Sequence, residues 1–161
     1  MMISNFDDAF AQICDIERGY VDNPDDPGGA TMYGITQAVA QANGYMGAMQ
    51  DLPLSTAQTI AKTQYWDRFM CDQFDPRIGY LIFDSAFNGG HPVQWLQQAA
   101  GVATDGVIGA QTIGAVRNLD PRQVCMRFNA YHAQYYASLK NFTFIDGWVN
   151  RIAANLLVCA Q

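Results

Sequence analysis

One glutamate stands out among the residues of this sequence that could do acid–base chemistry. Glu17 is the only glutamate among 15 acidic residues. Helical spacing from Phe6 reaches Phe10, Ile13 and then Glu17, so this carboxyl continues an apolar stripe. Burial against apolar groups disfavours the ionised form and raises a carboxyl pKa, which suits a general acid that must keep its proton near neutral pH. A solvated glutamate at a helix end, paired with Arg18, is the ordinary alternative.

A second carboxylate is available in the glycine- and proline-rich stretch that follows. Asp26 lies nine residues after Glu17, and Thr31 lies five residues further on. Hydrolysis of a glycosidic bond uses such a carboxyl pair, in which one group protonates the leaving oxygen and the other activates water or stabilises the developing positive charge. Thr31 could position the attacking water. Asp22 and Asp25 compete with Asp26 for the second role, and all three could instead serve turn chemistry.

Five further side chains are candidates for binding a sugar. Tyr33, Tyr65 and Trp66 could stack on sugar faces, although aromatic residues at helical spacing more often belong to a core. Asp84 lies in an apolar run and is therefore expected to be at least partly buried and hydrogen-bonded. It either anchors the backbone of a loop or lies in a cleft beside Asn88, where both would orient a sugar.

The elements that must position these residues are mainly helices. A first helix is expected behind a cap at Ser4 or Asn5, and residues 19–34 are expected to form a loop or short β-hairpin. Caps at Ser55, Asp75, Asp120 and Asp146 indicate later helices. The expected helical ranges after the hairpin are 36–43, 55–66, 78–88, 91–100, 121–139 and one that starts at 146. We therefore expect a mainly α fold of about seven helices with one small β excursion after the first.

A longer motif connects these residues to a known family. Residues 17–36 read E-R-G-Y-V-D-N-P-D-D-P-G-G-A-T-M-Y-G-I-T. This segment resembles the pattern E-G-G-Y-x-x-x-P-x-D-P-G-G-x-T-x-x-G-I-T of glycoside hydrolase family 108, which contains phage endolysins and secretion-associated muramidases. The likeness continues through residues 52–54, 65–67 and 83–89, and residues 95–102 and 105–112 resemble the helical peptidoglycan-binding half of these proteins.

The resemblance implies an α+β, lysozyme-like fold and N-acetylmuramidase activity on peptidoglycan. It implies a catalytic lobe over residues 1–88 and a helical peptidoglycan-binding lobe over residues 89–161 packed on it. Glu17 would be the essential acid, and a spacing similar to that of phage lysozymes favours Asp26 over its neighbours as the second carboxylate. No cofactor or metal is implied, and we expect a monomer. A lytic transglycosylase and a non-catalytic wall-binding or secretion-accessory protein are the two alternatives.

One residue departs from the family pattern beside the expected acid. Arg18 stands where the family usually has a glycine. An arginine side chain turned toward Glu17 would favour the ionised carboxylate and weaken acid catalysis. Because neighbouring positions on a helix face different directions, we expect Arg18 to point to solvent.

Composition excludes several other classes of function. A net charge of −6 and a pI of about 4.5 argue against nucleic-acid binding, and no apolar run approaches the ~20 residues of a membrane span. Residues 1–8 lack the features of a signal peptide, so we expect cytoplasmic synthesis and delivery to the wall by a holin or a secretion system. The scattered cysteines are expected to be buried free thiols, and they form no zinc site with the two histidines. These are Cys14, Cys71, Cys125 and Cys159, with His91 and His132.

Overall fold

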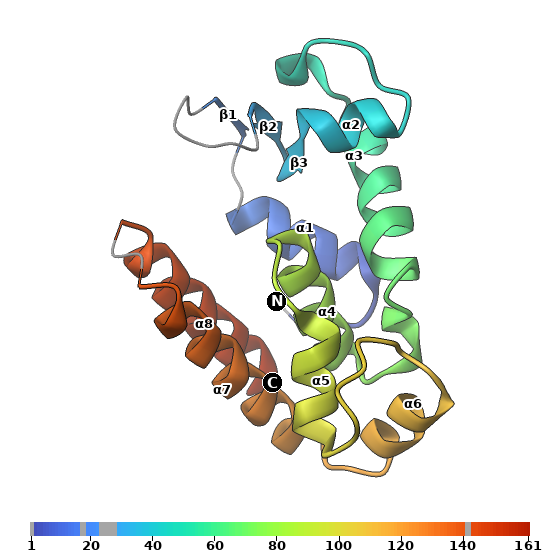
Figure 1. Ribbon diagram of the computed structural model, residues 1–161. Coiled ribbons are helices and arrows are strands. Elements are labelled where there is room, and N and C mark those ends of the chain that lie inside the picture. The colour runs from blue at the N-terminus through green and yellow to red at the C-terminus, as the bar shows by residue number, and fades with distance from the viewer. Residues whose placement is uncertain (1, 17–18, 23–28, 141–142) are drawn as a thin grey trace.

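The computed structural model describes residues 2–16, 19–22, 29–140 and 143–161. This part of the chain contains eight α-helices and one three-stranded antiparallel sheet (Figure 1). The predicted mainly α fold with a small β excursion after the first helix is confirmed, with eight α-helices in place of about seven. In chain order the elements are α1 (Phe6–Ile16), β1 (Tyr20–Val21), β2 (Thr31–Met32), β3 (Ile35–Thr36), α2 (Gln37–Ala42), η1 (Met49–Asp51), α3 (Leu54–Ala61), η2 (Lys62–Asp67), η3 (Cys71–Gln73), α4 (Pro76–Phe87), α5 (Pro92–Ala100), α6 (Ala110–Arg117), α7 (Pro121–Ser138) and α8 (Ile145–Cys159).

Side-chain caps begin three of the helices as the sequence predicts. Asn5 Oδ1 accepts a hydrogen bond from a backbone N–H in the first turn of α1 at 3.0 Å. Asp75 and Asp120 accept one from the backbone N–H two residues on, at 3.0 and 2.8 Å, and each precedes a proline at the first helical position. The caps predicted at Ser55 and Asp146 were wrong, because α3 and α8 each begin one residue earlier and place these side chains inside the first turn.

Helix α4 is the centre of the molecule. All of its residues from Ile78 to Ser85 are buried, because α1 packs on α4 and so do α5, α7 and α8 (Figure 1). Phe6 of α1 lies against Phe83 of α4 at 5.8 Å between ring centroids, and Trp95 of α5 lies against Phe128 of α7 at the same separation. The buried hydrophobic residues on both sides of the predicted boundary between residues 88 and 89 belong to one cluster. One core thus continues across this boundary, and the division into two lobes stays a prediction.

The small sheet follows α1, and a tight turn joins its second and third strands. Strand β2 pairs with β1 through Val21 and Thr31 and with β3 through Met32 and Ile35. The two residues between β2 and β3 are Tyr33 and Gly34, with φ of 53° and 73°. Positive φ at both positions is the type I′ geometry that matches the twist of a two-residue hairpin. The turn therefore needs a residue such as glycine at its second position.

Candidate functional site

The apolar stripe of α1 is buried, and the helix itself ends one residue before the predicted acid. Phe6, Phe10 and Ile13 are 8%, 4% and 0% exposed. Helix α1 ends at Ile16, and the described chain resumes at Gly19 and enters β1. Four residues of the predicted site lie outside the described residues, so their roles stay predictions: Glu17, Arg18, Asp25 and Asp26.

Thr31 lies in the middle strand of the small sheet. Its pairing partners are Val21 in β1 and Thr36 in β3, and its side chain is half-buried. The exposed Asp22 follows β1 directly and accepts a hydrogen bond from the Tyr20 hydroxyl at 3.2 Å. In the sequence, every candidate for the second carboxylate lies between β1 and β2. Thr31 is the first residue of β2, so it follows all of these candidates in the chain.

Phe87 joins the hairpin to the aromatic residues of the following helices. A Cβ atom added at Gly34 would overlap the Phe87 ring, so the turn rests directly on this side chain. The Phe87 ring also contacts Tyr65 and Phe83, with ring centroids 4.8 Å and 5.5 Å away. Burial raises the pKa of Tyr65. The structure therefore brings the hairpin, with half-buried Tyr33 at its turn, close to Tyr65.

Trp66 lies in the core. Its side chain is 2% exposed and its ring packs edge-on against Phe6 and Phe83. Its indole N–H donates to Asp72 Oδ1 at 2.8 Å. This placement favours the structural alternative for Trp66, because a buried indole with a satisfied N–H offers no face for a sugar.

Asp84 holds α8 against α4. Its side chain is 0% exposed, and its two carboxylate oxygens accept from Arg151 Nη1 at 2.9 Å and from Asn155 Nδ2 at 3.0 Å. Asn88, exposed directly after α4, donates from Nδ2 to the Asp84 carbonyl at 2.7 Å. These contacts favour the anchoring role for Asp84, with a helix rather than a loop as the anchored element.

Sequence reasoning missed the two partners of Asp84. Arg151 and Asn155 lie 67 and 71 residues further along the chain. Their spacing of four places them on one face of α8, which is the only local signal that they act together. That signal does not identify which buried group they meet.

The loop between α5 and α6 is organised around a buried amide. Gln97 is 1% exposed; its Nε2 donates to Asp105 Oδ1 at 2.6 Å, and its Oε1 accepts from the backbone N–H of Gly106 at 2.9 Å. The backbone N–H of Val107 also donates to Asp105 at 2.9 Å. The hydrogen bond from the Val107 N–H, and after it the one from Gln97 Nε2, lower the pKa of Asp105. These contacts indicate that the segment is a turn that joins the packed helices α5 and α6.

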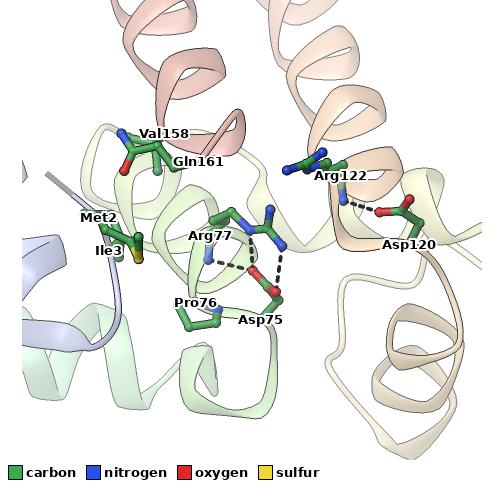
Figure 2. Close-up of a pocket in the computed structure, with 9 residues that line it drawn as sticks. All are labelled: Met2, Ile3, Asp75, Pro76, Arg77, Asp120, Arg122, Val158 and Gln161. Carbon is green, nitrogen blue, oxygen red and sulfur yellow. Dashed lines mark hydrogen bonds and ion pairs between the residues drawn. The ribbon is translucent and has the colours of Figure 1, made fainter.

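A cavity of about 520 Å³ lies at the opposite end of α4 from Asn88 (Figure 2). Arg77 and Arg122 reach it from the first turns of α4 and α7. Arg77 is paired with Asp75 at 2.8 Å, which lowers the pKa of that carboxyl. The remaining wall is formed by Met2, Ile3, Pro76, Asp120, Val158 and Gln161.

Two further properties concern only the part of the chain that the structure describes. It holds no group of three or more histidine, cysteine, aspartate or glutamate side chains that could bind a metal ion. None of its helices is both long enough and apolar enough to cross a bilayer.

Comparison with known proteins defines the class. The profile of the glycosyl hydrolase 108 family matches residues 10–90, and that of a predicted peptidoglycan domain matches residues 91–153. Together they support a hydrolase that acts on peptidoglycan. The chain belongs to the glycosyl hydrolase 108 family.

A solved structure agrees with this assignment and confirms the predicted lysozyme-like fold. The structure of Brucella abortus SagA is similar over 96% of this chain and 93% of that chain, with a TM-score of 0.87 and 30% sequence identity. The comparison with curated proteins found no match.

Proposed function

We propose that the protein is a muramidase that hydrolyses the β-1,4 bond between N-acetylmuramic acid and N-acetylglucosamine in peptidoglycan. Glu17 donates the proton to the leaving oxygen, Asp26 supplies the second carboxylate, and Thr31 helps to place the attacking water. Tyr33 and Tyr65 contact the glycan next to these catalytic residues. Because the wall lies outside the cytoplasm, the enzyme is delivered by another agent, a holin or a secretion system.

The observation that carries this proposal is the burial of the α1 stripe. Phe6, Phe10 and Ile13 all face the core, and the same spacing leads next to position 17. The same spacing predicts that a carboxyl at position 17 borders apolar surface, and such surroundings raise a carboxyl pKa toward the range of a general acid. The family match over residues 10–90 includes the same position.

The pairing of the strands supports the rest of the site. Val21 pairs with Thr31, so the chain between them must leave β1 and return to β2 within a few residues. That segment follows β1, the first strand after α1, and contains Asp22, Asp25 and Asp26. A second carboxylate near the acid is what either stereochemical course of glycoside hydrolysis requires.

The proposal is tested by Glu17→Gln on purified sacculi. We expect release of reducing sugar to fall by roughly 10²–10⁴-fold, because proton donation to the leaving group contributes about that much. Asp146→Asn, at an exposed acid in the first turn of α8, is the matched control and should retain full activity. Wild-type lysis by Glu17→Gln would refute the assignment.

Asp22→Asn, Asp25→Asn and Asp26→Asn separate the candidates for the second carboxylate. We expect the largest loss at Asp26. A larger loss at Asp22 or Asp25 would move the second carboxylate to that position.

The products distinguish hydrolysis from the alternatives on the same bond. Hydrolysis leaves a reducing N-acetylmuramic acid end, whereas a lytic transglycosylase leaves a 1,6-anhydro end. Mass spectrometry of the released muropeptides should therefore show reducing ends. Co-sedimentation with sacculi without release of either product would indicate a wall-binding protein that has kept the fold.

A further inference from the structure

Two of the four cysteines meet between the last two helices. Cys125 lies in the second turn of α7 and Cys159 is the last residue of α8, and they are 0% and 5% exposed. Their side chains lie close enough to interact with each other. Asn129 links the two positions, since its Nδ2 donates to the Cys125 carbonyl at 3.0 Å and lies 3.8 Å from Cys159 Sγ. Both sulfurs are free thiols.

The surroundings of Cys159 differ from those of the other cysteines. Burial raises the pKa of Cys14 to about 11 and also raises that of Cys71. For Cys159 the interaction with the Cys125 side chain lowers the pKa, and the positive charge of Arg77 acts in the same direction. Since the thiolate is the nucleophile in thiol–disulfide exchange, Cys159 is the sulfur suited to attack first.

The cavity of Figure 2 lies beside the chain segment that carries Cys159. It is lined by Val158 and Gln161, which flank Cys159 in the chain, and by Arg77, whose charge acts on both sulfurs. Its volume of about 520 Å³ lies within the range of sites that bind small molecules, roughly 300–1,000 Å³. A small disulfide that carries carboxylates would meet the arginine side chains there.

We propose that Cys125 and Cys159 form a reversible intrachain disulfide by exchange with a small disulfide of the glutathione type. The Cys159 thiolate attacks one sulfur of glutathione disulfide, which forms a mixed disulfide and releases one glutathione. Cys125 then loses its proton and attacks Cys159 Sγ, which releases the second glutathione. The two cysteines lose two electrons and two protons, and glutathione disulfide gains them as two molecules of glutathione.

The bond would fasten the end of α8 to the beginning of α7. Helix α8 carries Arg151 and Asn155, the two residues that bind Asp84 of α4. A cross-link that closes a loop of this size restricts the unfolded chain more than the folded one. Oxidation would therefore stabilise the helical side of the molecule, independently of the chemistry proposed for Glu17.

Peptide mapping of the intact protein tests the proposal directly. The reduced, folded chain is equilibrated with glutathione buffers from fully reduced to fully oxidised, quenched in acid, alkylated and digested with trypsin. We expect a cross-linked pair of peptides 123–127 and 152–161, which contain Cys125 and Cys159. Cys14 and Cys71 should be recovered alkylated.

The melting temperature gives a second readout. Oxidation of the wild type should raise Tm by about 5–10 °C, and the same rise should appear in Cys14→Ala, which keeps the pair. Cys125→Ala and Cys159→Ala should show no rise. The proposal is overturned if glutathione stays attached to either cysteine without a cross-link, if the cross-link includes Cys14 or Cys71, or if it forms only after unfolding in urea.

Discussion

The hairpin that follows α1 and the packing around α4, α7 and α8 are built in opposite ways. The strands of the hairpin have two residues each and both residues of β1 are exposed. The sheet is held by backbone pairing, by Ile35 of β3, which is buried in the core, and by the contact of its turn with Phe87. The helical side instead buries polar side chains deep in the protein: Asp84, Asn129, His132 and Asn155 are all at most 2% exposed.

The proposed chemistry thus lies at the hairpin, whereas we expect the helical side to contribute most of the stability. A shallow hairpin leaves room for an extended glycan, and glycine and aspartate turns allow close approach. Buried polar groups stabilise a fold only when their partners are present. We therefore expect substitutions on the helical side to change the free energy of unfolding most, and substitutions in the hairpin to change activity more than stability.

The largest effect on stability is expected at Asp84. Asp84→Ala removes the carboxylate that accepts from Arg151 and Asn155 inside the core and should lower the free energy of unfolding by about 3–5 kcal/mol, because breaking a buried ion pair from one side is strongly destabilising. Urea denaturation measures this loss. The double variant Asp84→Ala/Arg151→Met should lose less than the sum of the two single variants. A cost below about 1 kcal/mol for Asp84→Ala would show that this ion pair does not hold α8.

The next effect is a pH dependence that originates at His132. This ring stacks on Trp95 at 4.4 Å, and burial lowers its pKa to about 4, with Asp84 and Arg151 acting on it in opposite directions. The folded state therefore keeps the ring neutral while the unfolded chain takes up a proton below pH ~6.5. Stability is fully present above that pH and falls by up to about 3 kcal/mol as the pH decreases to about 4.

Two histidine variants isolate this dependence. His132→Phe should remove the loss of stability between pH 6.5 and 4.5, whereas His91→Gln, at an exposed ring, should leave it unchanged. An NMR titration gives a second check, because the His132 ring should remain neutral at pH 5. Protonation of this ring near pH 6.5 in the folded protein would contradict the prediction.

The two regions also differ in what could be predicted from the sequence. The caps at Asp75 and Asp120 and the hairpin after α1 were predicted because turns and helix starts depend on neighbouring residues. The contacts of Asp84 could not be predicted, since Arg151 and Asn155 are brought to it by the packing of whole helices. Trp66 shows the same limit, because periodicity places it on a helix but does not decide between a core and a sugar-binding face. Glu17 and Asp26 lie outside the described residues, and their roles rest on the sequence and the family.

Gly34→Ala tests the hairpin side of the comparison. The alanine Cβ would meet the Phe87 ring at a backbone φ of 73°, and we expect a loss of roughly 2 kcal/mol, about half from the left-handed backbone and the rest from displacing the ring. Gly44→Ala is the matched control, because its φ of 89° imposes the same kind of backbone strain while a Cβ there meets nothing within 4 Å. Urea denaturation of both variants separates the two contributions. Since a small displacement of catalytic groups can lower rates by about 10²-fold, sacculus hydrolysis by Gly34→Ala should fall by ten- to a hundredfold at a temperature where the protein remains folded, and that by Gly44→Ala should not. Equal activities in the two variants would mean that the contact with Phe87 does not position the site.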